Sequence, residues 1–210
     1  MIRVIIADDH PIVREGLARL VGDEPEMSVV AEAGSGDELL RHLGEFGADV
    51  LLLDVSMPGP GVLETIRRVR AKLPELRVLV LSAHPEDQYA VRCLRAGAWG
   101  YLSKQRTGRE LIEAIRRLHG GQHYVTDTLA EYLAAEISPD AERTPHELLS
   151  DREYQVLCLL GAGKSVQEAS ERLRLSPKTV STYRARVLEK IGLATTAGLI
   201  RYAVEHGLHA

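Results

Sequence analysis

Carboxylate, hydroxyl and amine side chains follow the apolar runs in the first half of the sequence. In chain order these side chains are Asp8, Asp9, Asp54, Ser82 and Lys104. Carboxylates that meet in one crevice repel one another unless a cation neutralises them. An all-oxygen set of few ligands, completed by water, suits Mg²⁺, whereas zinc would require cysteine or histidine. If the runs are neighbouring strands, the sequence therefore predicts a magnesium site where they end.

Asp54 has the chemistry of a nucleophile in such a site, because a bound cation would screen its neighbours and an incoming phosphoryl group. Lys104 would pair with the transferred phosphoryl group, and the Ser82 hydroxyl would donate a hydrogen bond to it. Taken singly, Asp9 could be a helix cap, Asp54 a turn residue and Lys104 a surface charge. We favour the joint interpretation, because all of them coincide with the ends of runs.

The elements that must position these residues alternate along residues 1–118. Apolar runs at 2–7, 28–31, 50–53, 78–81 and 99–102 are separated by stretches of helical spacing near 11–21, 37–46, 62–72, 86–96 and 107–118. Continuous Val, Ile and Leu runs suit strands covered on both faces, and short connections suit right-handed crossovers. We therefore predict an α/β doubly wound five-stranded parallel sheet, in which ligands bind beyond the carboxyl ends of the strands.

From residue 149 onward the strand pattern ends and signals for helix starts become frequent. The spacing of capping boxes occurs at Ser150 with Glu153 and at Ser165 with Glu168, and Ser176 precedes Pro177 as a helix cap. Four helices are predicted, near 151–161, 166–173, 177–191 and 196–206. The connection between the second and third has the length found in helix-turn-helix motifs, so we expect a small all-α four-helix domain.

The net charge of −4 is unevenly distributed. Residues 119–149 carry one basic and six acidic side chains, whereas residues 150–192 carry eight basic and five acidic ones. An acidic connector before a basic segment indicates separate units, the later one facing a polyanion. We expect domains at 1–119 and 148–210, joined by a linker at 120–147 that contains a helix near 126–137.

Composition excludes several other classes of protein. With 45% hydrophobic and 27% charged residues, the chain of 210 residues is expected to fold around a core. Its apolar runs are far shorter than the roughly 20 residues of a membrane-spanning helix. The first run leads into Asp8 without a cleavage-site pattern, so a cytoplasmic location is expected. Cys93 and Cys158 lie in separate helical patterns and are expected to be free, buried thiols.

The motifs of the first half resemble the receiver domain of bacterial response regulators, over essentially all of residues 1–118. The resemblance rests on Asp8-Asp9, the run 53–59, Ser82-Ala83 and the run 97–104. It implies a flavodoxin-like strand order 2-1-3-4-5. It also implies that Asp54 accepts phosphate from the phosphohistidine of a sensor kinase, and that Ser82, Tyr101 and Lys104 read the phosphoryl group. The implied Mg²⁺ ligands are the Asp9 and Asp54 side chains and the Ser56 backbone carbonyl, with Asp8 acting through water.

Two positions depart from the usual receiver pattern. Val62 stands where the family commonly has glycine, and Gly59 and Gly61 are expected to compensate in the loop after Asp54. Gln105 follows Lys104 where many receivers have a proline in a cis peptide. A cis bond before a residue other than proline costs about 2.5–4 kcal/mol, so a trans bond is expected there.

Residues 149–153, 163–165 and 175–184 resemble the LuxR-type helix-turn-helix, and the whole chain then resembles a NarL/FixJ-type response regulator. One side of the third helix is apolar, with Val180, Val187, Leu188 and Ile191, and the other is short and polar. Such a polar face can lie in the major groove of DNA. Ser181 and Thr182 are candidates for base contacts, and Lys178, Thr179 and Arg186 for phosphate contacts. Tyr183 and Ser181 depart from the commoner histidine and lysine, and Arg184 and Lys190 rank lower as backbone contacts.

The combined resemblance implies a transcription regulator that is not an enzyme. Its expected partners are a sensor histidine kinase, double-stranded promoter DNA, RNA polymerase and, when phosphorylated, a second copy of the chain. Phosphorylation is expected to draw Ser82 and Lys104 toward the new group while Tyr101 moves inward. The face formed by residues 86–118, or the face formed by residues 11–21 with 107–118, would then favour dimers or release the DNA-binding helices. The last helix, with Leu199, Ile200, Ala203 and Val204 on one side, either dimerises or packs on the other three.

Two other functions stay open. A phosphohydrolase could use Asp54 as a transient nucleophile, although Ser56, and not a second carboxylate, stands two residues later. A regulator could also use its receiver for dimerisation without ever being phosphorylated, although the intact acidic set argues against this.

Overall fold

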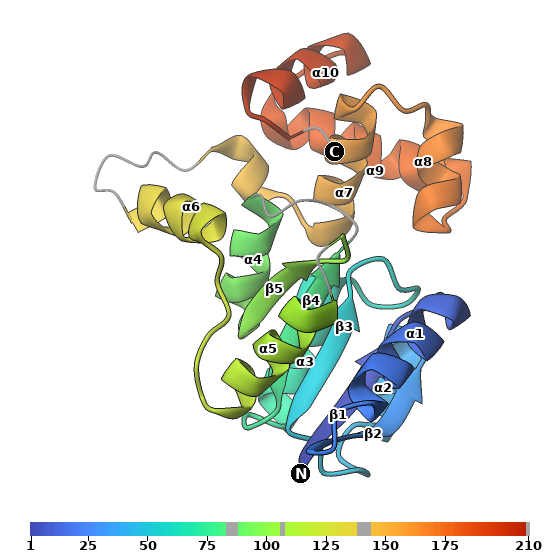
Figure 1. Ribbon diagram of the computed structural model, residues 1–210. Coiled ribbons are helices and arrows are strands. Elements are labelled where there is room, and N and C mark those ends of the chain that lie inside the picture. Colours follow the sequence, from blue (N-terminus) through green and yellow to red (C-terminus); the bar gives the residue numbers. More distant parts are fainter. Residues whose placement is uncertain (83–87, 106–107, 138–143, 209–210) are drawn as a thin grey trace. The chain divides into compact units, whose positions relative to one another are not determined.

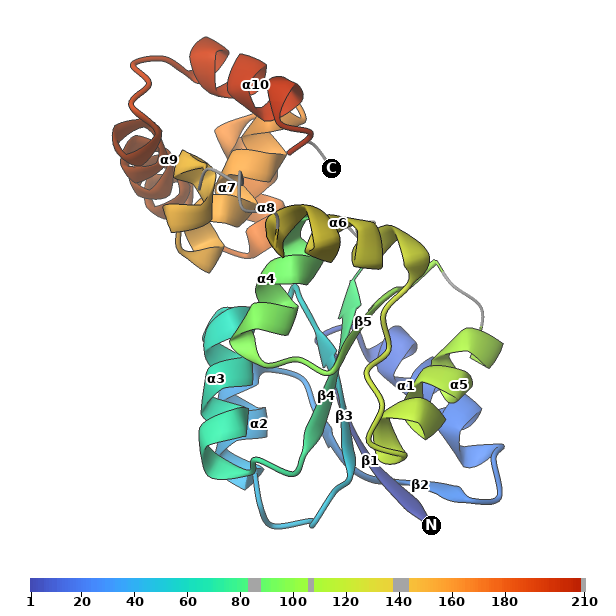
Figure 2. The same cartoon turned by 90° about the vertical axis from the view of Figure 1, so that its left-hand side faces the viewer.

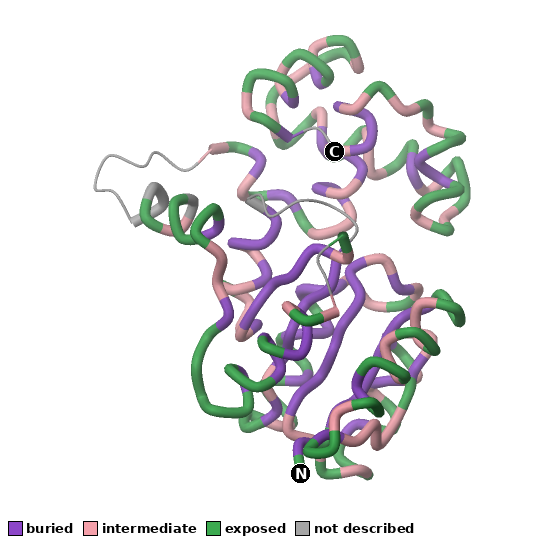
Figure 3. The backbone as a smooth tube through the Cα atoms, viewed as in Figure 1, coloured by how far each residue is buried: buried purple, intermediate pink, exposed green. Residues whose placement is uncertain are grey.

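The computed structural model describes residues 1–82, 88–105, 108–137 and 144–208. The chain forms two compact units, Met1–Ile137 and Ser138–Ala210 (Figure 1). Each unit has its own buried core, shown in purple in Figure 3.

The first unit is built on a sheet of five parallel strands in the order β2-β1-β3-β4-β5, as predicted. The strands are β1 (Ile2–Ala7), β2 (Met27–Ala33), β3 (Val50–Asp54), β4 (Arg77–Ser82) and β5 (Gly100–Ser103). One face is covered by α1 (Pro11–Gly22) and α5 (Gly108–His119), and the other by α2 (Gly36–His42), α3 (Val62–Lys72) and α4 (Gln88–Ala96) (Figure 2). This is the doubly wound arrangement.

The core of this unit explains why its central strands read as continuous apolar runs. Every residue of β3 is buried, because helices cover the strand on both sides. On one side, Leu52 belongs to a buried cluster that includes Leu111 and Ile115 of α5. Each large apolar side chain buried in this way contributes about 1.5–3 kcal/mol. The strands are thereby held in the register that brings their carboxyl ends together.

Some bounds differ from those that the sequence predicted. The strand expected at 28–31 is longer at both ends, and the helix expected at 37–46 ends at His42. Leu43 has extended backbone angles, and Gly44 and Gly47 have φ of 101° and 55°, so the chain leaves the helical conformation early. Two predicted helices begin outside the described residues, one at residues 86 and 87 and the other at residue 107.

The segment after α5 continues along the outer edge of the sheet. The Tyr124 amide donates to the carbonyl of Trp99 at 3.0 Å, and Tyr124 forms a parallel bridge with Gly100. A Cβ atom on Gly100 would lie 2.9 Å from the Tyr124 carbonyl oxygen, so glycine permits this approach. The His123 ring stacks on Trp99, with centroids 4.5 Å apart. Helix α6 (Asp127–Ile137) then packs beside α4 (Figure 2), within the first unit.

The second unit contains the four predicted helices, preceded by a short 3₁₀ turn that was not predicted. These elements are η1 (Pro145–Leu148), α7 (Asp151–Gly161), α8 (Val166–Leu173), α9 (Pro177–Ile191) and α10 (Thr196–Glu205). Both expected capping boxes are present at the starts of α7 and α8. Ser176 accepts a hydrogen bond from the Thr179 amide at 3.1 Å, which confirms the cap of α9. Residues 138–143 of the predicted linker lie outside the described residues.

Helix α10 divides its apolar side between two environments. Leu199 and Ala203 are fully buried, whereas Ile200 and Val204 are 36% and 57% exposed. Cys93 is buried and Cys158 is half-buried, and neither forms a disulfide. None of the helices in the described part of the chain has the length and apolar character needed to traverse a bilayer.

Candidate functional site

The three carboxylates meet at the carboxyl edge of the sheet. Asp8 and Asp9 follow β1, and Asp54 ends β3, which pairs with β1 through Ala7 and Leu53. Asp8, Asp9 and Asp54 are only 0%, 9% and 2% exposed. Burial of adjacent carboxylates is costly unless cations pair with them. The crevice therefore has the composition of a cation site.

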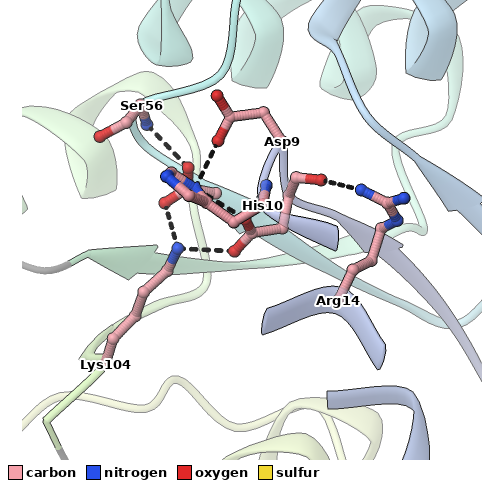
Figure 4. A network of polar contacts seen from close by, with 7 residues as sticks. Asp9, His10, Arg14, Ser56 and Lys104 are labelled. Carbon is pink, nitrogen blue, oxygen red and sulfur yellow. Dashed lines mark hydrogen bonds and ion pairs between the residues drawn. The ribbon is translucent and has the colours of Figure 1, made fainter. Parts of the chain in front are cut away.

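Lys104 supplies one such cation from the loop after β5. Its Nζ lies 2.6 Å from Oδ2 of Asp8 and 2.7 Å from Oδ1 of Asp54 (Figure 4). The Lys104 amide donates to the Ser82 carbonyl at 2.6 Å, which ties this loop to the end of β4. The lysine thus bridges two carboxylates from two neighbouring strands.

Burial and charge act in opposite directions on the pKa values of this pair. Burial raises the pKa of Asp54 above its usual value, and the attraction of Lys104 only partly offsets it. Burial alone would lower the pKa of Lys104, but the attraction of Asp54 and Asp8 outweighs it and raises that pKa. The lysine therefore keeps its proton, and the carboxylate gains from any further cation that approaches.

The other predicted site residues come from the loop after β3, from the end of β4 and from β5. The Ser56 amide donates to Oδ2 of Asp54 at 3.1 Å, so the loop after β3 folds back over the carboxylate. Ser82 ends β4 and is 1% exposed. Tyr101 in β5 is 0% exposed, so its ring is buried. Strand alternation explains this, because the neighbouring Leu102 belongs to the core on the α5 side and Tyr101 points to the opposite face.

The two departures from the receiver pattern leave the site intact. Gly59 has φ of 107°, and a Cβ atom there would lie 3.0 Å from Oδ2 of Asp37, so glycine is required at this point of the loop. Val62 is buried as the first residue of α3. The peptide bond before Gln105 is trans, as are the others in the described residues.

Two residues of the site were missed by the sequence analysis. The amide of His10 donates to Oδ1 of Asp8 at 2.8 Å, and its Nδ1 lies 2.7 Å from Oδ1 of Asp9 (Figure 4). Arg14 Nη1 donates to the backbone carbonyl of Asp8 at 2.7 Å, and its Nε pairs with Glu32 of β2. Position in the sequence could have indicated both residues, because His10 directly follows the two aspartates and Arg14 lies one helical turn later.

The donor atoms of this cluster fit a divalent cation. One ligand atom from each of Asp8, Asp9, His10 and Asp54 lies within 4.8 Å of all the others. Carboxylate oxygens make up most of the set, which suits a hard cation such as Mg²⁺. The expected Ser56 ligand lies in the adjoining loop, because its amide contacts Asp54.

The second candidate site is the outer face of α9. Val180 and Val187 are fully buried, as expected for the apolar side of this helix. On the outer side, Lys178, Ser181, Thr182 and Arg186 are exposed, and Thr179, Tyr183 and Arg184 are half-buried. A hollow of about 310 Å³ is lined by Lys178, Thr179, Thr182, Tyr183 and Arg186. A polar, cationic face of this kind suits a nucleic acid.

Hydrogen bonds distinguish the candidates on this helix. The Thr182 hydroxyl donates to the Lys178 carbonyl at 3.0 Å, so its lone pairs remain for an incoming donor. The Thr179 hydroxyl pairs with that of Ser176 at 2.8 Å in the helix cap. Lys190 pairs with Glu153 of α7 at 2.7 Å, so this residue braces the fold and is a poorer candidate for DNA than the sequence suggested.

Comparisons with known proteins identify a family for each of the two units. The response regulator receiver domain family matches residues 4–116, and the luxR family of bacterial regulatory proteins matches residues 147–203. The chain is 40% identical over 209 residues to the response regulator GacA of Pseudomonas viridiflava, covering 99% of this chain and 98% of that protein.

Solved structures show the same organisation. RcsB from Salmonella enterica serovar Typhimurium, bound to promoter rprA in the presence of the phosphomimetic BeF₃⁻, matches with a TM-score of 0.63 at 27% identity, over 96% of this chain and 97% of that one. A structure of two RcsB dimers bound to two parallel DNAs matches with a TM-score of 0.60 at 27% identity, over 97% and 98% of the chains. The chain belongs to the NarL/FixJ-type response regulators, transcription regulators in which a receiver domain precedes a LuxR-type DNA-binding domain.

Proposed function

We propose that Asp54 is the phosphoacceptor of this response regulator. The observation that carries the proposal is the convergence of Asp54 with Asp8, Asp9 and Lys104 in one buried crevice at the carboxyl edge of the sheet. A carboxylate oxygen of Asp54 attacks the phosphorus of a phosphohistidine on a sensor kinase. The phosphorus–nitrogen bond breaks, and the released imidazole takes up a proton.

The neighbouring residues prepare Asp54 and receive the product. The Asp9 and Asp54 side chains and the Ser56 carbonyl would hold Mg²⁺, with Asp8 acting through water, and the ion would screen the negative charge of the incoming group. Lys104 and Ser82 move onto the phosphoryl oxygens, as a charge-assisted pair and a hydrogen-bond donor. Lys104 thereby exchanges its contacts with Asp8 and Asp54 for the phosphoryl group, while Tyr101 moves inward to fill the space left by Ser82.

The output is binding of promoter DNA by α9. Lys178, Thr179 and Arg186, with Arg184 in a secondary role, contact phosphates, and Ser181, Thr182 and Tyr183 face the base edges. Specific sites for such helices occur as paired half-sites, so the phosphorylated protein acts as a dimer. The DNA-bound dimers of RcsB support this assembly by similarity. RNA polymerase is the partner through which a DNA-bound regulator of this kind acts on transcription.

The test compares wild-type protein with Asp54→Asn. Both are incubated with Mg²⁺ and a small phosphodonor, then assayed by phosphate-sensitive gel, by size-exclusion chromatography and for binding to duplex DNA selected from a random pool. We expect incorporation, dimer formation and tighter DNA binding in the wild type alone. Equal DNA binding by both proteins would instead support a regulator that works without phosphorylation.

A further inference from the structure

His10 stands at the opening of the acidic crevice in a fixed backbone conformation. It precedes Pro11, which restricts it to extended geometry, and its φ and ψ are −94° and 109°. Its amide is held by Oδ1 of Asp8 at 2.8 Å. The backbone of His10 is therefore held beside the carboxylates, and 54% of its side chain is exposed.

The ring nitrogen has the spacing of a metal ligand relative to the carboxylates. Nδ1 of His10 lies 2.7 Å from Oδ1 of Asp9 and 3.4 Å from Oδ1 of Asp8. Two adjacent ligands of an octahedral ion at about 2.1 Å are separated by about 3.0 Å, and opposite ligands by about 4.2 Å. The distance to Oδ1 of Asp9 is close to that of an adjacent pair.

We propose that His10 is a further ligand of the divalent cation at this site, adding one imidazole nitrogen to the carboxylate oxygens of Asp9 and Asp54 and the carbonyl of Ser56. This inference rests on the metal-assisted phosphoacceptor site proposed above. The neutral ring directs its Nδ1 lone pair to the ion and keeps its proton on Nε2, which the exposure of the ring leaves in contact with water.

The consequence is a change in metal preference. Mg²⁺ favours oxygen ligands and binds imidazole weakly, whereas Mn²⁺ accepts nitrogen more readily. A pocket with His10 therefore binds Mn²⁺ more tightly relative to Mg²⁺ than the same pocket without it. Because Asp54 is in the same cluster, this preference sets which cation accompanies phosphorylation.

The experiment uses the full-length chain, its His10→Ala variant and a His42→Ala control. His42 is a half-exposed histidine of the same unit that pairs with Glu45. Titration calorimetry gives the Mn²⁺ and Mg²⁺ affinities of each protein. Electron spin-echo spectroscopy of the Mn²⁺ complex detects a directly coordinated ¹⁴N nucleus. Thermal unfolding followed by circular dichroism checks that each variant is folded.

We expect His10→Ala to weaken Mn²⁺ binding by about tenfold and Mg²⁺ binding by less than about twofold, and to abolish the nitrogen signal. His42→Ala should retain all three wild-type values. A wild-type Mn²⁺ complex without a nitrogen signal would overturn the role of His10 and leave the phosphoacceptor site standing. Failure of the wild type to bind either cation would overturn the metal site itself, and with it this proposal.

Discussion

The ammonium of Lys104 lies 2.7 Å from the carboxylate of Asp54, so the phosphoacceptor and the cation proposed to bind its phosphoryl group already form an ion pair. The same ammonium contacts Asp8 at 2.6 Å. Lys104 thus neutralises the oxygens that a divalent cation would also neutralise. The lysine and the metal compete for the carboxylates until a phosphoryl group provides the lysine with another partner.

Replacing Lys104 should strengthen Mg²⁺ binding. In Lys104→Met, Asp8 and Asp54 lose their cation, so the metal-free protein should be destabilised by about 1–3 kcal/mol, less than for a fully buried pair because Lys104 is 21% exposed. Mg²⁺ affinity should rise by about tenfold, which corresponds to about 1.4 kcal/mol of lost competition. Titration calorimetry, with thermal unfolding at increasing Mg²⁺ concentration, measures both changes.

Lys72→Met, at an exposed lysine of α3, is the matched control and should change neither quantity. Weaker Mg²⁺ binding by Lys104→Met would mean that the lysine organises the carboxylates for the metal and does not compete with it.

Removal of one cationic side chain from α9 should weaken binding to all DNA sequences alike and should reduce the dependence of binding on salt. Lys178→Ala and Arg186→Ala each remove one phosphate contact, so each should reduce the slope of log affinity against log salt by about 0.9. Fluorescence anisotropy with specific and unrelated duplexes, at several salt concentrations, measures this. Arg201→Ala, at an exposed arginine of α10 in the same unit, should keep the wild-type slope. An unchanged slope in the α9 variants would exclude this face as the phosphate-binding surface.

The ends of strands and the starts of helices could be predicted, because their signals come from residues close together in the chain. The strand ends could be predicted because buried parallel strands read as unbroken apolar runs, and a polar residue such as Asp54 marks where burial by helices stops. The helix starts at Ser150 and Ser176 were equally readable, because a cap is formed by residues close in the chain.

Contacts between distant segments could not be read in this way. The pairing of Tyr124 with Gly100 depends on where α5 ends, and the ion pair of Lys190 with Glu153 depends on how α9 crosses α7. His10 was overlooked because a histidine beside two aspartates has no periodicity of its own. Its relation to Asp9 depends on the extended backbone that Pro11 imposes.

The pair of Glu153 and Lys190 should make the second unit sensitive to acid. Burial alone would raise the pKa of Glu153, but hydrogen bonds from Lys190 and Ser150 outweigh it and lower the pKa below the usual 4.5. A lowered pKa in the folded state means that the ionised carboxylate contributes stability above pH 4.5, and that this contribution disappears as pH falls through the folded-state value.

Glu153→Gln should therefore cost about 1–2 kcal/mol at neutral pH, the scale of charge-assisted hydrogen bonds to a half-exposed partner. The difference from wild type should shrink as the pH falls below 4.5. Urea unfolding, followed through the amide resonances of α7–α10, isolates the second unit for this comparison. A difference that stays constant over the whole pH range would show that Glu153 acts through packing and not through its charge.

The close contact of Gly161 with Ala203 should make every residue other than glycine destabilising at position 161. A Cβ atom on Gly161 would lie 2.4 Å from Cβ of Ala203, so Gly161→Ala forces α7 and α10 apart. The overpacking should destabilise the unit by about 1–3 kcal/mol, although alanine is the better helix former by about 1 kcal/mol. Gly16→Ala in α1 is the opposite case, since a Cβ atom there meets nothing within 4 Å, and it should stabilise the first unit by about 0.5–1 kcal/mol.

Adding Ala203→Gly to Gly161→Ala tests whether the loss comes from this contact. The second change returns the missing space, so the double variant should be more stable than the sum of the single effects predicts, and the interaction energy should be favourable. Urea unfolding of the four proteins of this cycle, followed at the resonances of α7 and α10, gives that energy. Strictly additive effects would mean that α7 and α10 move apart freely, in which case the close contact does not determine the packing of the DNA-binding unit.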